Sequence, residues 1–338
     1  MNGKPLDMTA RRALVLGAGL IVAEGLLTGC GRHSPSMLNT KGSEATTIAG
    51  LWWLMFGLGA AVYAVVGGLI IWAILRGRRG GGGEGKVSDD AWIVWGGIAV
   101  PVVILGVLAV TTVQATAQLR KPEANAVRVQ IVGKRWWWDV TYADARFTTA
   151  NEIHLPAGRP VEISLDSDNV IHSFWVPQLA GKVDLIPGQH NVLRFTPETP
   201  GTYEGRCAEF CGIEHARMGF VVVVQAPVDF DRWVARHQSA PTPPDAETAA
   251  QGEQTFMRMS CAGCHTVEGT QAVGKVGPNL TDFGGRGAIG ANTISNTPSN
   301  LARWITNAQS VKPGSLMPPI PLSDTERNNV VSYLEGLK

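Results

Sequence analysis

The sequence predicts a multidomain membrane protein, in which a transmembrane hairpin of two helices precedes two separate folded domains. Three observations support this prediction. Only 17% of the 338 residues are charged, fewer than in an ordinary soluble globular protein. Two long runs without any charged residue hold much of the apolar excess. Beyond these runs the chain changes to short alternating segments, and a proline-rich stretch then sets off a compact C-terminal segment.

The charge balance excludes one broad class of function. The chain has 29 basic and 28 acidic side chains and a formal net charge of +1. It therefore lacks the surplus of positive charge that sequence-independent binding to nucleic acid requires. The hydrophobic content of 45% also excludes a largely disordered chain, because such chains lack enough apolar side chains to form a core.

The N-terminus is typical of an export signal. A basic start that includes Arg11 and Arg12 precedes an apolar run, which ends in Leu-Thr-Gly-Cys at Cys30. This ending resembles the lipobox of bacterial lipoproteins. The resemblance implies that residues 1–29 are a signal peptide and that Cys30 carries a lipid. The alternative is an ordinary buried helix with a chance cysteine, and Glu24 inside the apolar stretch favours that alternative.

The two uncharged runs, residues 45–75 and 91–119, are expected to cross the membrane. A helix needs about 20 residues to span a hydrocarbon core of ~30 Å, and both runs are longer. Tryptophans near the ends of the runs, such as Trp72 and Trp92, suit the boundary between membrane and water. A buried hairpin in a soluble core is the alternative, and the length of two uncharged runs argues against it.

The connecting loop, residues 76–90, predicts the orientation of the hairpin. It carries three arginines and Lys86, and positively charged loops stay on the cytoplasmic side. Residues 30–44 and everything after Leu119 are therefore expected on the outer side of a bacterial inner membrane.

Residues 122–232 are expected to form an all-β domain. Residues 127–132 and 161–165 alternate apolar and polar side chains, and residues 221–224 are a run of valines. Prolines, often beside glycines, separate these segments. Many short strands at close spacing predict an antiparallel sandwich or barrel.

Five side chains of this domain suit a copper site. Cys207, Cys211, His215 and Met218 follow one another at spacings of four, four and three, and His172 precedes them. Single-copper electron-transfer sites use two histidines, one cysteine and a weak methionine ligand. The second cysteine here allows two sulfurs to bridge a pair of copper ions. A disulfide and a structural zinc site are the alternatives. The disulfide explains neither histidine, and zinc leaves Met218 unexplained.

Three stretches of the chain resemble subunit II of the haem–copper cytochrome c oxidases. They are VIHSFWVP at residues 170–177, DLIPG at 184–188 and CAEFCGIEHARM at 207–218. The resemblance covers about residues 45–224 and includes the two membrane helices. It implies a cupredoxin fold with a binuclear copper centre, CuA, and association with oxidase subunits I and III. Quinol-oxidase relatives lack the copper ligands, so the ligands seen here exclude that branch.

The resemblance also implies the ligand set of the copper centre. Its six members are His172, Cys207, the backbone carbonyl of Glu209, Cys211, His215 and Met218. Both coppers share the thiolates of Cys207 and Cys211. One copper also takes His172 and Met218. The other also takes His215 and the backbone carbonyl of Glu209. The Glu209 carboxylate would reach a magnesium ion at the interface with subunit I.

Residues 133–138, which include three consecutive tryptophans, resemble the family's aromatic segment beside CuA. Trp136 matches the tryptophan through which electrons enter the copper centre. Packing at a strand is the alternative, because alternate side chains of a strand face the core. For Trp137 this alternative is at least as strong as a role in electron transfer.

The C-terminal segment, residues 245–338, carries a haem-attachment signal. Cys261, Cys264 and His265 form the pattern C-x-x-C-H, in which the thiols bond a c-type haem and the histidine ligates its iron. No histidine follows, and Met317 is the only later methionine, so Met317 is the expected sixth ligand. A thioredoxin-like redox pair is the alternative, but no βαβ pattern surrounds the cysteines.

This segment resembles a class I cytochrome c, which is an all-α fold. The resemblance rests on the haem signal, on GPNL at residues 277–280 and on amphipathic stretches at 301–305 and 327–337. An expected linker at residues 233–244, stiffened by prolines, joins it to the β domain. The fusion resembles the caa-type oxidases, and this implies an external cytochrome c or a quinol–cytochrome c reductase as the electron donor.

These interpretations account for all five cysteines: one for lipid, two for copper and two for haem. Together they predict the subunit II of a terminal oxidase, which passes electrons from its haem to CuA and on to subunit I, where oxygen is reduced to water with proton pumping. Rival functions are a stand-alone membrane electron carrier, a copper-delivery protein and the copper subunit of a nitric oxide reductase. A copper-delivery protein would release its metal and would need no haem.

Overall fold

The computed structural model describes residues 35–78, 88–239 and 246–338. The chain divides into two units, of which residues 37–338 form the larger and contain every element below. Cys30 and the expected signal peptide lie outside the described residues. So do most of the loop between the apolar helices and the prolines of the expected linker.

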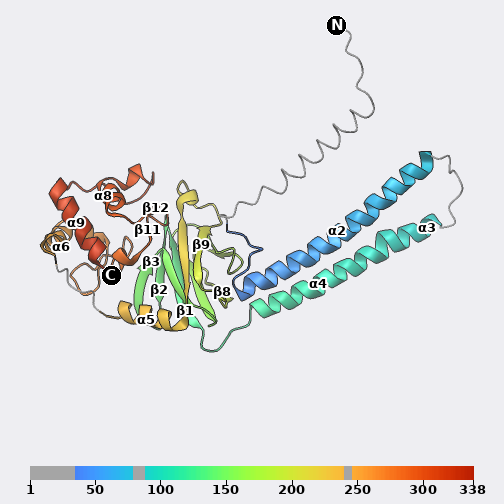
Figure 1. Cartoon of the computed structure of the whole chain (residues 1–338), viewed down its shortest axis with the longest axis horizontal. Helices are drawn as coiled ribbons and strands as arrows, with labels where there is room; N and C mark the ends of the chain where they lie inside the picture. The colour runs from blue at the N-terminus through green and yellow to red at the C-terminus, as the bar shows by residue number, and fades with distance from the viewer. Residues whose placement is uncertain (1–34, 79–87, 240–245) are drawn as a thin grey trace, which may run out of the picture. The chain divides into compact units, whose positions relative to one another are not determined.

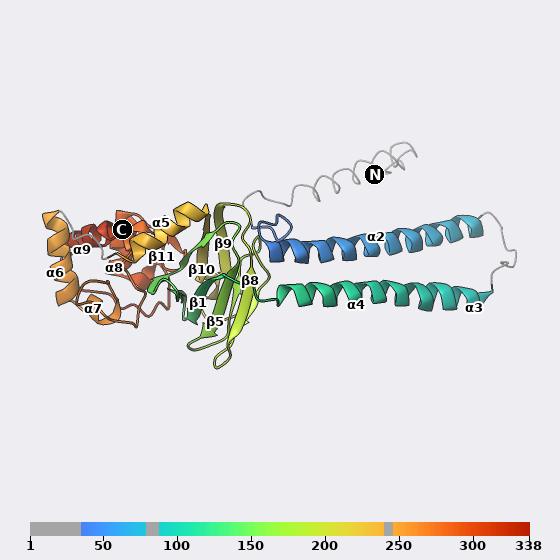
Figure 2. The same cartoon turned by 90° about the horizontal axis from the view of Figure 1, so that it is seen from below.

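Two long apolar helices form the expected hairpin. The first is α2 (Ser43–Arg78); the second comprises α3 (Asp89–Ala91), a π-helical stretch (Trp92–Ala99) and α4 (Val100–Leu119). Figure 2 shows α2 and α4 side by side. Both are long and apolar enough to cross a membrane. Their large apolar side chains are mostly exposed, which is a surface suited to lipid and not to water.

The β domain is a sandwich of two five-stranded sheets (Figure 1). One sheet has the order β3-β2-β1-β5-β8 and the other β4-β10-β9-β6-β7. The strands are β1 (Val127–Lys134), β2 (Trp137–Tyr142), β3 (Phe147–Ala150), β4 (Glu152–Pro156), β5 (Val161–Ser167), β6 (His172–Trp175), β7 (Val183–Leu185), β8 (Asn191–Phe195), β9 (Gly201–Cys207) and β10 (Gly219–Gln225).

The expectation of a purely antiparallel domain is wrong in one respect. Each sheet contains one parallel pair, β1 with β5 and β4 with β10. A tight turn cannot join parallel neighbours. The chain meets this requirement because it forms other strands between the two members of each pair. The paired strands are therefore far apart in the sequence.

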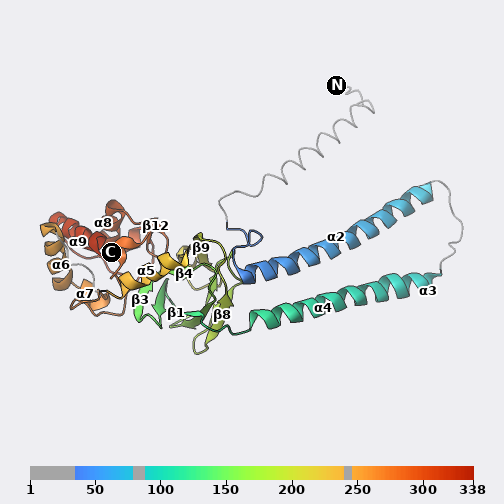
Figure 3. The ribbon, with the colours of Figure 1, turned by 60° about the horizontal axis from the view of Figure 1, so that its bottom comes forward.

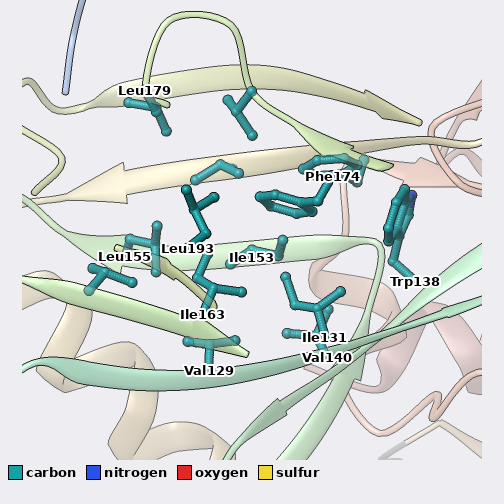
Figure 4. Packing of buried hydrophobic residues seen from close by; sticks show 14 of the residues in the cluster. Val129, Ile131, Trp138, Val140, Ile153, Leu155, Ile163, Phe174, Leu179 and Leu193 are labelled. Carbon is teal, nitrogen blue, oxygen red and sulfur yellow. The ribbon is translucent and has the colours of Figure 1, made fainter. Parts of the chain in front are cut away.

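The core of the sandwich lies between the two sheets (Figure 4). Ile131 and Val140 from one sheet face Ile153 and Phe174 from the other, and all four are at most 1% exposed. Their polar neighbours along the strands point outward, as the alternation predicts. Trp138 is fully buried at the edge of this core, which agrees with the expectation that the tryptophan run is partly a packing feature.

The helix α5 (Pro227–His237) extends the β domain beyond its expected C-terminal boundary. The expected linker starts at residue 233, but the structure continues the helix to His237 and buries Trp233 against the sandwich beside β4 (Figure 3). The Trp233 ring stacks on the His154 ring at 4.2 Å between centroids. Phe230 is buried one turn earlier, so the apolar face of α5 belongs to the sandwich core.

The C-terminal domain is helical apart from one short hairpin. Its elements are α6 (Glu247–Arg258), α7 (Cys261–Cys264), β11 (Ala288–Ile289), β12 (Ile294–Ser295), α8 (Pro298–Thr306) and α9 (Asp324–Gly336). The expected amphipathic stretch at 301–305 falls within α8, and the one at 327–337 lies in α9 except for its last residue, Leu337. α6 crosses α9 closely at Gly252, where a Cβ would lie 2.0 Å from the carbonyl oxygen of Asn329. Only glycine permits this packing.

Candidate functional site

The structure brings together the five side chains that the sequence proposes as copper ligands. Cys207 Sγ lies 3.8 Å from Cys211 Sγ and 3.9 Å from His172 Nδ1. Cys211 Sγ in turn lies 3.7 Å from both His215 Nδ1 and Met218 Sδ. These donor atoms come from β6, from the end of β9 and from the loop that leads to β10.

The sandwich holds this copper loop, residues 207–218, at both ends. The amide of Cys207 donates to the carbonyl of Met218 at 3.0 Å and so closes the loop. The amide of Ala208 donates to the carbonyl of Ser173 at 3.0 Å, which fixes the loop to β6 next to His172. On the other sheet, a Cβ at Gly133 would lie 2.7 Å from the His172 ring. The strand β1 can therefore pass the histidine only because this residue is glycine.

The two thiols form a coupled pair. The hydrogen bond with Cys211 lowers the pKa of Cys207 to about 3, against the effect of burial. The same hydrogen bond, together with burial, raises the pKa of Cys211. A soft cation between the two sulfurs would be held by both.

The donor set fits copper better than the alternatives. A disulfide needs sulfurs about 2.0 Å apart, and at 3.8 Å both cysteines are free thiols. Donor atoms 3.7–3.9 Å apart suit metals bound at about 2.0–2.3 Å. Two sulfurs, two imidazoles and a thioether exceed the four ligands of structural zinc, whereas copper takes all three ligand types.

Glu209 contributes its backbone and its side chain in different directions. The carbonyl oxygen lies 3.2 Å from Cys207 Sγ, so it faces the cluster of donors. The residue itself is exposed, together with its neighbour Phe210. The carboxylate is therefore free to meet another molecule, while the carbonyl remains with the copper loop.

The second site is an apolar cavity in the helical domain. Cys261, Cys264, His265 and Met317 all line it. His265 Nδ1 donates to the carbonyl of Pro278 at 2.8 Å, which leaves Nε2 as the atom available for a metal. Burial lowers the pKa of His265, so the imidazole is neutral and able to ligate. A Cβ at Gly277 would lie 2.5 Å from this ring, so glycine is required there as well.

The cavity fits a large apolar group that carries an acid. Its walls include the aromatic and aliphatic side chains of Phe256, Leu280 and Leu301. The guanidinium of Arg286 also lines it, and its buried Nε has no hydrogen-bond partner among the described residues. Burial lowers the pKa of Arg286. A carboxylate inside the cavity would supply the missing acceptor, and haem provides both an apolar ring and carboxylates.

The cavity extends to the β domain at Trp136. This residue and its neighbour Trp137 line the cavity together with the haem-attachment residues. The Trp136 indole also donates from Nε1 to the carbonyl of Cys211 at 2.9 Å. A Cβ at Gly212 would lie 3.1 Å from the indole, so the ring packs on the copper loop. Trp136 thus contacts both candidate sites.

Sequence reasoning missed one charged residue between the sites, Lys312. Its side chain crosses to the β domain, and its Nζ donates to the carbonyls of Trp136, Arg217 and Gly290 at 2.7, 2.8 and 3.0 Å. Burial lowers its pKa to about 7, although Glu214 and Cys211 act to raise it. Nothing in the sequence around Lys312 signals this, because all three acceptors are backbone atoms distant along the chain.

Two protein families match the chain. "Cytochrome C oxidase subunit II, periplasmic domain" matches residues 143–226, and "Cytochrome c" matches residues 249–338. The first match contains the copper loop, and the second contains the haem-attachment residues.

Full-length relatives agree with these matches. A protein of Alkalihalophilus pseudofirmus named cytochrome c oxidase subunit 2 is 33% identical and covers 92% of this chain and 94% of the relative. A protein of the same name from Bacillus sp. strain PS3 is 31% identical and covers 93% of this chain and 94% of the relative. The solved periplasmic domain of subunit II of cytochrome oxidase from Bradyrhizobium japonicum is 28% identical, covers 35% of this chain and 96% of that chain, and has a TM-score of 0.33.

Proposed function

The chain belongs to the family of cytochrome c oxidase subunit II, with a cytochrome c domain fused to it, and we propose that it passes electrons from its own haem through two copper ions to a partner subunit. Membership of the family makes it part of a haem–copper oxidoreductase complex. The family also implies copper in the sandwich and haem in the helical domain. The number of coppers, the ligands and the route are the proposal.

The copper centre in this proposal is binuclear. Cys207 and Cys211 bridge the two ions; one ion adds His172 and Met218, and the other adds His215 and the carbonyl of Glu209. The convergence of all these donor atoms supports this assignment. Two ions that share an electron spread its charge over many bonds, which keeps the structural change on transfer small.

The haem in this proposal is bound through Cys261 and Cys264, with His265 and Met317 as axial ligands. Their common position around the cavity supports this, as does the free Nε2 of His265. Covalently bound haem supplies a one-electron carrier whose potential a thioether ligand raises. Trp136 lines the same cavity and would lie next to the haem once it is bound.

The electron route runs through Trp136. The observation that supports it best is the double contact of this residue: its ring lines the haem cavity, and its Nε1–H bonds the carbonyl of the copper-binding Cys211. One side chain therefore contacts both sites. A covalent tether between the domains keeps donor and acceptor at high effective concentration.

The surroundings of the chain follow from the same proposal. The two apolar helices anchor it in the bacterial inner membrane, with both cofactor domains on the outer side. Cys30 carries a lipid after removal of residues 1–29. Subunit I receives the electrons and reduces oxygen with proton pumping, subunit III joins the complex, and the exposed Glu209 carboxylate reaches a magnesium ion at the interface with subunit I. An external cytochrome c or a quinol–cytochrome c reductase supplies the electrons.

Flash-induced electron transfer in the purified complex tests the route. We expect Trp136→Phe, which removes the indole N–H but keeps a ring, to slow transfer from haem to copper, and Trp136→Ala to slow it further, by at least about tenfold. Trp137→Ala is the matched control, because Trp137 lines the cavity but has no hydrogen bond to the copper loop in the described structure. Parent rates in both Trp136 variants, with both cofactors present, would remove this residue from the route.

A further inference from the structure

Lys312 connects the haem-binding segment to the copper loop. It lies five residues before Met317, on the segment that supplies the proposed sixth ligand of the haem. Its Nζ bonds the carbonyl of Arg217, the residue directly before the copper ligand Met218, and the carbonyl of Trp136, the proposed electron bridge. One side chain therefore bonds the backbone of the copper loop and the backbone of the proposed electron bridge.

The chemistry of this contact requires the ammonium form. Nζ donates to three carbonyl oxygens at once, and only the protonated amine has three N–H bonds. The residue is 3% exposed, and among the described residues no carboxylate lies within ion-pair distance of it. A buried cation without an anionic partner is tolerated only where hydrogen bonds replace its water. Removal of the cation would take this donor from all three carbonyls.

Other contacts also join the helical domain to the β domain. They lie at different distances from the proposed electron route. The amide of Gly219 donates to the carbonyl of Ala291 at 3.1 Å, and the amide of Gly287 donates to Glu152 at 3.1 Å. These bonds lie along the short β11–β12 hairpin. Next to Lys312, a Cβ at Gly314 would lie 2.3 Å from Ile213 Cδ1, so the Lys312 segment packs tightly on the copper loop itself.

We propose that Lys312 is a positioning residue that holds the haem domain against the copper loop, so that Trp136 spans the two cofactors. This inference rests on the proposed transfer of electrons from haem to copper. Lys312 carries no electron itself. Its three hydrogen bonds keep the Met317 segment, the Trp136 backbone and the copper loop in one arrangement, and the transfer rate depends on the fraction of molecules in that arrangement.

The test compares Lys312→Met with the parent in the complete purified complex. Methionine keeps the length and apolar character of the side chain but has no donor. We expect unchanged haem and copper content and unchanged midpoint potentials, but a haem-to-copper rate about tenfold lower, because the loss of charge-assisted hydrogen bonds weakens the docked state. The variant's rate should also fall as solvent viscosity rises, since the haem domain must diffuse back to dock. The parent rate should not.

Two further variants separate positioning from other effects. Lys275→Met removes an exposed positive charge from the same domain and should keep the parent rate and its independence of viscosity. Lys312→Arg keeps a cation with several donors and should recover part of the rate. It also serves as the test variant if Lys312→Met changes the optical spectrum of the haem.

The outcomes are distinct. A parent-like rate in Lys312→Met, or a slow rate without any viscosity dependence, contradicts the positioning role and leaves the proposed function intact. Equal slowing by Lys275→Met would assign the effect to charge alone and contradict it too. If the parent itself shows no transfer from haem to copper within one molecule, the result contradicts the proposed function and not only the role of Lys312.

Discussion

The two cofactor domains differ in how far the protein alone completes each site. In the sandwich, the donor atoms of the copper site lie 3.7–3.9 Å apart, and only three of the donor residues, Cys207, Cys211 and Met218, belong to a core cluster that other side chains mostly fill. In the helical domain, the site and the core are largely the same. Of the thirteen buried residues in its main apolar cluster, eight also line the cavity: Phe256, Leu280, Phe283, Ile289, Leu301, Ile305, Val330 and Leu334.

The difference is that copper binds to a domain that is already folded, whereas haem supplies part of the core of the helical domain. A copper ion adds bonds between side chains that are already in place. A haem supplies the partner surface for most of a small core, and apolar side chains that face no partner stabilise little. We therefore expect the two domains to respond differently when each cofactor is withheld.

The largest expected effect is that of losing the haem. Replacement of both Cys261 and Cys264 by serine should unfold the helical domain, with a loss of at least about 5 kcal/mol, which is most of the stability of a small domain. Hydrogen exchange followed by mass spectrometry should show loss of protection in α6, α8 and α9, while the sandwich strands stay protected. If the helices stay protected in the haem-free chain, the two domains do not differ in how far their folding depends on a cofactor.

Loss of copper should stop electron transfer but, unlike loss of haem, leave its own domain folded. Cys207→Ser should abolish the copper pair and lower electron transfer to the partner subunit by more than about 100-fold, because Cys211 is the one cysteine left in the sandwich domain and it already serves as the other bridge. The sandwich should stay folded, with a change in unfolding free energy within about 2 kcal/mol. Electron spin resonance and thermal unfolding measure the two effects. In the parent, a spectrum of one localised copper would contradict a shared pair.

Two glycines test whether each site tolerates displacement of its histidine. Gly133→Ala puts a Cβ 2.7 Å from the His172 ring, and Gly277→Ala puts one 2.5 Å from the His265 ring. Each should cost about 1–3 kcal/mol of stability and alter the spectrum of its own cofactor only. Gly287→Ala is the control, because its Cβ would have no neighbour closer than 4.0 Å. A copper spectrum unchanged in Gly133→Ala would mean that the loop, and not β1, positions His172.

The smallest expected effect concerns pH and the contact between the domains. Burial alone would raise the pKa of Glu152, but hydrogen bonds from His154 and from the amide of Gly287 outweigh it and lower the pKa below 4.5. The carboxylate therefore stabilises the folded state above the unfolded pKa, and this contribution is lost as the pH falls through the lower, folded value.

Glu152→Gln should remove this part of the acid sensitivity. Its unfolding free energy should fall less steeply than that of the parent below about pH 5. Glu204→Gln, an exposed position on β9, is the control and should follow the parent curve. Coincident curves for Glu152→Gln and the parent in acid titrations of thermal unfolding would contradict the contribution.

The comparison also shows which predictions depended on local sequence. Five of the six proposed copper ligands lie within twelve consecutive residues, so the spacing of Cys207, Cys211, His215 and Met218 was sufficient to propose a cluster. The proposed haem-attachment residues likewise lie within five consecutive residues, Cys261 to His265. The end of the β domain was predicted too early, at residue 232, because the proline-rich stretch that follows drew attention away from the apolar face formed by Phe230 and Trp233.

The sequence by itself determined the two apolar helices, the change to a β domain, and the chemistry of each cofactor site, because these properties follow from composition and from spacings of a few residues. Only the tertiary structure decided how the sites meet. Lys312 bonds carbonyls that lie 22, 95 and 176 positions away along the chain, and Trp136 bonds one that lies 75 positions away. Backbone carbonyls occur at every residue and carry no signature of side-chain type, so contacts of this kind exist only once the fold has brought the segments together.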